Sequence, residues 1–146
     1  MYLLDANVLI YAFRRDSPHH FPCYQWLTNT LAGEDRVATT SVVELALLRN
    51  ATLPALGTAA AARAEVFRFL GLLKDEPTVL RIEPGEQHLD ILSGLCAKLK
   101  LRGNDTNDAF LAALSMEYGV TLVTADRGFN RFSGVRVMNP LQQPAA

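Results

Sequence analysis

Four acidic residues stand at positions where an apolar sequence becomes polar. Asp5 closes the run YLLD and Asp126 closes the run TLVTAD. Glu44 follows the run RVATT by four residues, and Asp108 lies in the polar stretch GNDTND, which precedes an apolar helical pattern. A buried carboxylate without a partner is costly, so each of these acids needs a compensating hydrogen bond or cation.

Carboxylates that share one pocket have a specific chemistry. Two of them about 5 Å apart repel by about 3 kcal/mol at an effective dielectric constant near 20. Four would protonate or move apart unless a cation lay between them. Oxygen ligands without His or Cys favour hard ions such as Mg²⁺ or Mn²⁺, which activate water and neutralise charge in phosphoryl chemistry. The acids therefore predict a divalent-metal site.

Each acid also has a purely structural alternative. These are an N-cap at Asp5, an S/T-x-x-E capping box at Ser41 and Glu44, a helix cap at Asp105 and Asp108, and a turn at Asp126. The alternatives do not predict that all four acids lie at one edge of the fold, where no Lys or Arg is obliged to lie among them.

The elements that would position these acids alternate along the chain. Strands are predicted at residues 2–5, 36–40, 78–82, 121–126 and 134–138. Helices are predicted at residues 6–14, 17–33, 41–52, 58–73, 86–101 and 103–120, with Ser17 as an N-cap and Pro18 in the first turn. Apolar strands between helices predict an α/β sandwich whose parallel sheet is covered on both faces. The carboxyl ends of parallel strands share one edge, where the acids would meet.

Composition restricts the class of protein. The 146 residues, 49% hydrophobic and 20% charged, predict one globular domain over residues 1–146. No apolar run reaches the ~18 residues of a membrane span, and the first residues lack the basic region of a signal peptide. Cys23 and Cys96 are expected to be reduced thiols in a cytoplasmic protein. The net charge of -1 argues against bulk attraction to nucleic acid, although not against local basic patches.

Several motifs together carry a resemblance to a known family. The segments LLDANVLIY, SVVEL, NDAFLAALSMEYGVTLVTADRGFNRF and GVRVMNP occur in this order over nearly the whole chain. They resemble the PIN-domain ribonucleases, and most closely the VapC-type toxins of bacterial toxin–antitoxin pairs. The resemblance implies a PIN-like three-layer sandwich: a central, mostly parallel twisted sheet of four to five strands with helices on both faces.

The resemblance also implies roles for individual residues. The acids that match the metal-binding and catalytic positions are Asp5, Glu44, Asp108 and Asp126. The accessory polar positions are matched by Asn7, Ser41 and Thr124, and Asp105 is interpreted as a cap or an auxiliary ligand. Phe110 departs from the polar residue that many relatives have there. The implied activity is hydrolysis of RNA by water activated by Mg²⁺ or Mn²⁺, and the implied partners are a cognate antitoxin and a second copy of the chain.

Basic residues next to the acids are candidates for RNA contacts. They are Arg14, Arg15, Lys98, Lys100, Arg102, Arg127 and Arg131. Such side chains would hold phosphates on either side of the scissile bond, whereas the alternative is a solvated surface. The helices between residues 44 and 73 carry more apolar surface than a small sheet can cover, which predicts a protein-binding groove or a dimer face.

Non-catalytic alternatives remain open. A phospho-acceptor receiver also places acids at strand ends, but it needs a Lys at the end of its last strand, where this chain has GVRVMNP. A haloacid-dehalogenase-like phosphatase needs D-x-D, and position 7 is Asn. A catalytically inactive PIN-like domain, or another acidic-pocket binding module, is the remaining alternative to a nuclease.

Overall fold

Five short parallel strands form the centre of the molecule. The computed structural model describes residues 1–142. The strands are β1 (Tyr2–Leu4), β2 (Val37–Thr39), β3 (Val79–Arg81), β4 (Thr121–Val123) and β5 (Val137–Met138), in the order β3-β2-β1-β4-β5. Each neighbouring pair is parallel. All five predicted strands are therefore confirmed, and β1, which carries Asp5 at its end, is the central strand.

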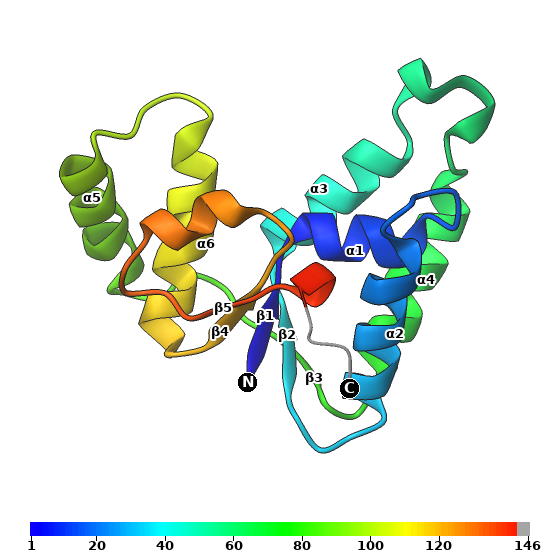
Figure 1. Cartoon of the computed structure of the whole chain (residues 1–146), viewed down its shortest axis with the longest axis horizontal. Coiled ribbons are helices and arrows are strands. Elements are labelled where there is room, and N and C mark those ends of the chain that lie inside the picture. The colour runs from blue at the N-terminus through cyan, green and yellow to red at the C-terminus, as the bar shows by residue number, and fades with distance from the viewer. Residues whose placement is uncertain (143–146) are drawn as a thin grey trace.

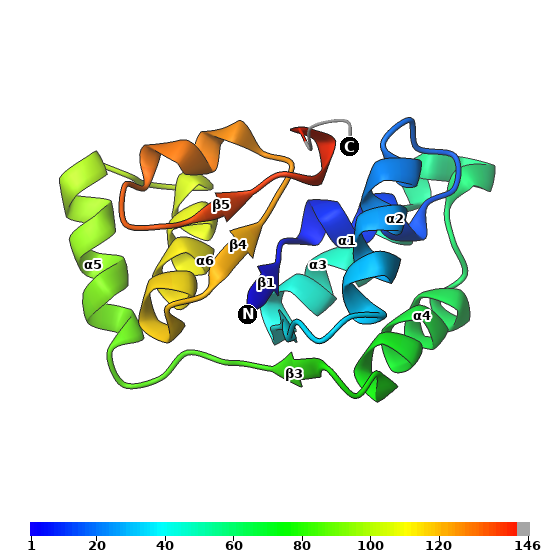
Figure 2. The same ribbon diagram turned by 60° about the horizontal axis from the view of Figure 1, so that its bottom comes forward.

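Helices cover both sides of this sheet. They are α1 (Ala6–Phe13), α2 (His20–Leu31), α3 (Ser41–Ala51), α4 (Arg63–Asp75), α5 (His88–Leu99) and α6 (Asp105–Tyr118), with 3₁₀ turns η1 (Pro54–Ala59), η2 (Arg127–Arg131) and η3 (Pro140–Gln142). Helices α5 and α6 lie together on one side of the strands, and α1 to α4 lie on the other (Figures 1 and 2). The predicted three-layer α/β architecture is confirmed.

The core explains why the strands are apolar throughout. Leu3 and Leu4 on β1 and Leu122 and Val123 on β4 are completely buried, although successive residues of a strand point to opposite faces. Both faces of the sheet are thus covered, which is the usual situation of a parallel sheet. Cys23 and Cys96 are free thiols, as predicted. Within residues 1–142, no helix combines the length and apolar character needed to cross a bilayer.

The predicted start of the second helix is wrong by two residues, since the N-cap residue is His19 and not Ser17. Helix α2 begins at His20, with His19 as its N-cap residue and no side-chain cap. Ser17 instead closes a turn before the helix: its Oγ accepts a hydrogen bond from the His19 amide at 3.1 Å, and its carbonyl accepts one from the His20 amide at 3.1 Å. The Ser17 hydroxyl therefore stabilises the turn that precedes α2 and does not cap the helix itself.

The alanine-rich segment is also not helical where the sequence predicts it. Residues 58 and 59 end the turn η1, residues 60–62 precede helix α4, and α4 begins only at Arg63. Gly57 has a φ of 57°, and the Ala61 amide donates a hydrogen bond to the Ala51 carbonyl at 2.8 Å. This contact ties the segment to the end of α3, so tertiary structure overrides the high helix propensity of alanine.

Candidate active site

Asp5 is held rigidly at the carboxyl end of the central strand. It is the N-cap of α1, and its Oδ1 accepts a hydrogen bond from the Ala6 amide at 2.6 Å. Its Oδ2 accepts from the Thr124 hydroxyl at 2.7 Å and from the Asn7 amide nitrogen at 3.1 Å. The capping alternative is thus correct, but it occupies only one carboxylate oxygen, and the other belongs to a network that reaches strand β4.

Thr124 is the centre of that network. It is fully buried, and while its hydroxyl donates to Asp5 its oxygen accepts from the Asp126 amide at 3.0 Å and from Asn7 Nδ2 at 3.1 Å. The Asn7 side-chain oxygen in turn accepts from the Ala125 amide at 3.1 Å. Every donor and acceptor of the two side chains that faces the network is used, so the ends of β1 and β4 are fixed relative to each other.

Asp126 and Asp108 approach this point from two other elements. Asp126 follows β4, and its Oδ1 accepts a hydrogen bond from the Gly128 amide at 2.8 Å, so the predicted turn is present as well. Asp108 lies in the first turn of α6, and its Oδ2 accepts a hydrogen bond from Arg131 at 3.0 Å. Because α6 leads into β4, its N-terminus lies near the carboxyl edge of the sheet, as predicted.

The three aspartates interact electrostatically. The pKa of Asp5 is raised to about 6, mainly by burial and further by the charges of Asp108 and Asp126, against the hydrogen bonds from Thr124 and Ala6. The pKa of Asp108 is also raised, by burial first and then by the charge of Asp126, while Arg131 acts in the opposite direction. The neighbouring charges therefore make the ionised forms of Asp5 and Asp108 less favourable, which is the situation that a cation relieves.

The donor set fits a hard divalent cation. It consists of carboxylate oxygens, with neither His nor Cys among the groups that affect Asp5 and Asp108. Within residues 1–142, no three acidic, His or Cys side chains are placed closely enough to enclose a metal ion as they stand. Binding would therefore require side-chain movements that bring Asp5, Asp108 and Asp126 closer together.

A cavity of about 380 Å³ opens beside Asp5 and Asp108, between residues of α3 and α6. Its lining residues are Asp5, Ala6, Val42, Val43, Leu45, Ala46, Arg49, Leu92, Thr106, Asn107, Asp108, Phe110, Leu111 and Phe129. We call it the acid cavity. Phe110, the departure from the family pattern, is part of its wall.

Glu44 does not line the acid cavity. Its carboxylate forms an ion pair with Arg81, and it lines two other cavities next to α4. Ala46 lies on the face of α3 that lines the acid cavity, and positions two residues apart on a helix point about 160° away from each other. The structure therefore places Asp5, Asp108 and Asp126 near enough to interact electrostatically, but it places the Glu44 side chain on another face of α3. Asp108 and Glu44 each form an ion pair with an arginine, Arg131 and Arg81 respectively.

Ser41, predicted as an accessory residue and as part of a capping box with Glu44, contacts a different residue, Glu83. The capping box with Glu44 is absent; instead the Glu83 carboxylate accepts hydrogen bonds from the Ser41 amide at 2.7 Å and from its hydroxyl at 2.9 Å. Glu83 also accepts from the Thr40 hydroxyl at 3.3 Å. Glu83 follows β3 by two residues, so the same rule that selected Asp5 and Asp126, an acid just after a strand, would have found it.

Asp105 does not cap its helix. It is the exposed first residue of α6, whose N-cap residue is Asn104, and the helix has no side-chain cap. Its charge contributes to the raised pKa of Asp108.

The predicted basic residues fall into separate groups. Arg131 contacts Asp108, and Arg127 begins the same turn η2. Lys98, Lys100 and Arg102 lie at and after the end of α5 and line none of the cavities described here. Arg14 and Arg15 line a second cavity instead of the acid cavity. Sequence reasoning missed Arg49, the basic residue that does line the acid cavity.

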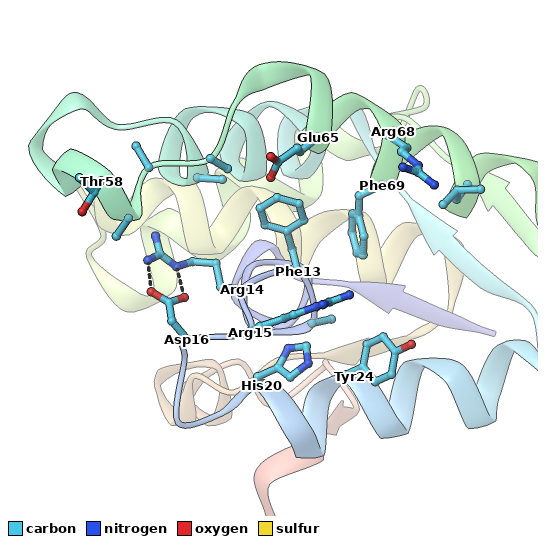
Figure 3. Close-up of a pocket in the computed structure, with 16 residues that line it drawn as sticks. Phe13, Arg14, Arg15, Asp16, His20, Tyr24, Thr58, Glu65, Arg68 and Phe69 are labelled. Carbon is cyan, nitrogen blue, oxygen red and sulfur yellow. Dashed lines mark hydrogen bonds and ion pairs between the residues drawn. The ribbon is translucent and has the colours of Figure 1, made fainter.

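The second cavity has a volume of about 810 Å³ and lies among α1, α2, η1 and α4 (Figure 3). Phe13 and Phe69 meet edge to face with centroids 5.4 Å apart, and Figure 3 shows Arg15 and Arg68 near these rings. Arg14 is paired with Asp16 at 2.7 Å. Leu45, Leu53, Phe67 and Leu72, all within residues 44–73, are exposed, which agrees with the predicted apolar surplus of this region.

Comparison with known proteins places this geometry in a family. The model of the family described as "PIN domain" matches residues 2–135 of this chain. Ribonuclease VapC31 and Ribonuclease VapC37 of Mycobacterium tuberculosis are each 36% identical over 140 residues; the aligned region covers 96% of this chain and 99% and 97% of those proteins.

Solved structures agree on the fold. A crystal structure of VapBC2 from Rickettsia felis bound to a promoter DNA fragment contains a chain with a TM-score of 0.71 at 19% identity, covering 94% of this chain and 97% of that one. A chain of VapBC-1 from nontypeable Haemophilus influenzae has a TM-score of 0.70 at 18% identity, and the match covers 97% of this chain and 98% of that one. The chain therefore belongs to the PIN-domain family, and the relatives it matches within that family are the VapC ribonucleases.

Proposed function

We propose that this protein is a metal-dependent endoribonuclease that acts as the toxin of a toxin–antitoxin pair. The observation that carries the proposal is the electrostatic coupling of Asp5, Asp108 and Asp126, from three separate elements, two of which, Asp5 and Asp108, line one cavity. The relatives named as VapC ribonucleases support the same activity. The alternative, an inactive module that only binds a partner, does not account for the Asp5 carboxylate, whose pKa is raised by burial and further by the charges of two other acids.

The chain's own residues provide orientation and charge. Thr124 and Asn7 fix the Asp5 carboxylate, the Gly128 amide fixes Asp126, and Arg131 holds Asp108. Mg²⁺ or Mn²⁺, held by these three acids, would supply an activated water and neutralise charge on the phosphodiester. A carboxylate of the cluster accepts the proton of the attacking water, and no covalent intermediate is required.

Purified protein incubated with total RNA is expected to cleave it in Mg²⁺ or Mn²⁺ and not in EDTA. Asp108→Asn is expected to reduce cleavage by at least about 100-fold, because a ligand and a charge of the site are lost. Glu44→Gln, which tests the predicted fourth ligand, is expected to cost less than about tenfold because its carboxylate contacts Arg81. Sequencing the new 5′ ends measures the reaction and identifies the cut sites.

The outcomes of this assay separate the alternatives. Equal cleavage in EDTA would contradict metal dependence, and full activity of Asp108→Asn would contradict the site. No cleavage of any RNA would favour the binding module. A loss in Glu44→Gln as large as in Asp108→Asn would show that Glu44 leaves Arg81 to join the metal site.

We further propose that the antitoxin binds in the cavity among α1, α2 and α4. Phe13, Phe69 and Leu72 give this cavity apolar walls. Arg15 and Arg68 are exposed, and neither forms an ion pair within residues 1–142. Apolar walls with free guanidinium groups suit a peptide segment that combines apolar and acidic residues. The homodimer stays a prediction, for which the exposed Leu45 and Phe67 beside α3 and α4 offer apolar surface.

Charge reversal tests this assignment. The double variant Arg15→Glu and Arg68→Glu is expected to weaken the complex with the cognate antitoxin at least about tenfold, because two favourable charge contacts become repulsive. RNA cleavage by the free variant is expected to stay within about twofold of wild type. Arg63→Glu, on the same helix α4 but outside the cavity, is the matched control. Unchanged affinity in an interferometry titration would place the antitoxin elsewhere.

A further inference from the structure

Arg49 is the basic residue of the acid cavity. It lies in the last turn of α3, on the face that carries Val42, Leu45 and Ala46 toward the cavity, and it lines the same cavity as Asp5 and Asp108. Among the described residues that line this cavity, no other is Lys, Arg or His. One positive side chain therefore borders a cavity whose chemistry is otherwise set by carboxylates.

The Arg49 guanidinium is also available for a ligand. Arg131 is paired with Asp108, Arg81 with Glu44, and Arg14 with Asp16. Arg49, in contrast, is exposed and has neither an ion pair nor a side-chain hydrogen bond with any residue of the described chain, 1–142. A free guanidinium presents a planar fork of N–H donors that matches two oxygens of a phosphate group.

The electrostatics of the cavity require such a group. Asp5 and Asp108 both line this cavity, and their carboxylates repel each other when both are ionised. An RNA phosphodiester that entered beside them would add another negative charge. A metal ion offsets part of this repulsion, and a cationic side chain in the lining of the same cavity offsets more of it and also orients the phosphate.

We propose that Arg49 is a catalytic residue that binds the non-bridging oxygens of the RNA phosphodiester in the acid cavity. The proposal rests on the nuclease function proposed above and names a residue that the sequence motifs did not select. Arg131 is less suited to this role, because one of its nitrogens is already bound to Asp108 at 3.0 Å.

A structural role would predict different behaviour. Arg49 lies in the last turn of α3, where a positive charge interacts favourably with the helix dipole. That role would change the thermal midpoint on substitution and leave RNA binding and the salt dependence of cleavage unaltered. Phosphate binding predicts the reverse, because each phosphate contact contributes to the release of counterions.

The test compares wild type with Arg49→Gln, Arg49→Lys and the control Arg63→Gln. Arg63 is an exposed arginine that lines none of the four cavities described. Steady-state cleavage of a labelled single-stranded RNA in Mg²⁺ gives kcat and KM at several salt concentrations. Fluorescence anisotropy of the same RNA in EDTA gives the Kd without turnover, and thermal unfolding reports on the fold.

Arg49→Gln is expected to lower kcat/KM by at least about 100-fold and to raise the Kd about tenfold. The slope of log Kd against log salt is expected to become shallower by about 0.7, the contribution of one phosphate contact on a single strand. Arg49→Lys keeps the positive charge but not the planar guanidinium, so its RNA affinity should be close to that of wild type, whereas its kcat should be only partly recovered. Arg63→Gln should stay within about twofold of wild type in every measurement.

Two results would overturn the proposal. One is cleavage and binding by Arg49→Gln within about twofold of wild type, and the other is an equal loss in Arg63→Gln, which would show a general charge effect. Failure of the nuclease function is distinguishable: wild type would then cut no RNA. The binding measurements would still decide whether Arg49 contacts phosphate. If Arg49→Gln did not fold, Arg49→Lys would decide the question through its kcat.

Discussion

Asp5→Asn is expected to abolish RNA cleavage and, in the absence of divalent metal, to make the fold more stable at neutral pH. The substitution removes a charge that the folded state disfavours, since the pKa of Asp5 is raised from 3.8 to about 6. This shift corresponds to at most about 3 kcal/mol at pH 7. The amide cannot accept every hydrogen bond that the carboxylate accepts, which costs about 1 kcal/mol, so a net gain of about 1–2 kcal/mol is expected.

The sign of the effect can be checked through pH. Because the folded state holds the Asp5 proton more tightly than the unfolded state, wild type loses stability as pH rises from about 4 to about 6 and is level above that range. Asp5→Asn lacks this loss, so the difference between the two proteins should grow over the same interval. Urea unfolding in EDTA at several pH values measures it, together with the RNA assay.

Asp16→Asn is the control for this experiment. The pKa of Asp16 is lowered by its hydrogen bond and charge contact with Arg14, the opposite direction to Asp5. Relative to wild type, this variant should therefore gain no stability as pH rises. It should cleave RNA as wild type does. A free energy of unfolding for Asp5→Asn that falls in parallel with wild type between pH 4 and 6 would contradict the proposed burial of the Asp5 charge.

Thr124→Val is expected to lower the free energy of unfolding by about 2–4 kcal/mol and to reduce cleavage at least about tenfold. Valine has nearly the same shape as threonine, so the change removes the hydroxyl without opening a cavity. The hydroxyl oxygen, fully buried, contacts Asp5 at 2.7 Å, Asn7 at 3.1 Å and the Asp126 amide at 3.0 Å. Buried polar groups left without partners cost about 1–3 kcal/mol each. Two of the three proposed metal ligands would lose orientation at once.

A matched substitution isolates the role of the network. The Thr28 hydroxyl donates to the Tyr24 carbonyl at 3.0 Å on an exposed face of α2, so Thr28→Val should change the free energy of unfolding by less than about 0.5 kcal/mol. Chemical unfolding and the RNA assay apply to both variants. If Thr124→Val were as stable and as active as Thr28→Val, the network would not be what orients Asp5 and Asp126.

The sequence by itself determined the sheet and the two acids at its strand ends. Short apolar runs separated by helical patterns predicted all five strands, because a parallel sheet is covered on both faces and needs apolar residues throughout. Asp5 and Asp126 directly follow such runs, so their edge of the sheet follows from chain direction alone. Asp108 was predictable for the same reason. A helix that leads into the amino end of a parallel strand begins near the carboxyl ends of the strands, and Asp108 lies in the first turn of such a helix.

Only the tertiary structure decided which side chains of α3 face the acids. This helix is apolar nearly all round: Val43 and Leu47 are buried, whereas Val42 and Leu45 are exposed. Its rotation is therefore fixed by packing against α1 and α4 and not by its own pattern of apolar residues. That rotation directs Arg49 into the acid cavity and Glu44 toward Arg81. Charge contacts between residues distant in sequence depend on how packed elements are oriented, and no local propensity encodes that orientation.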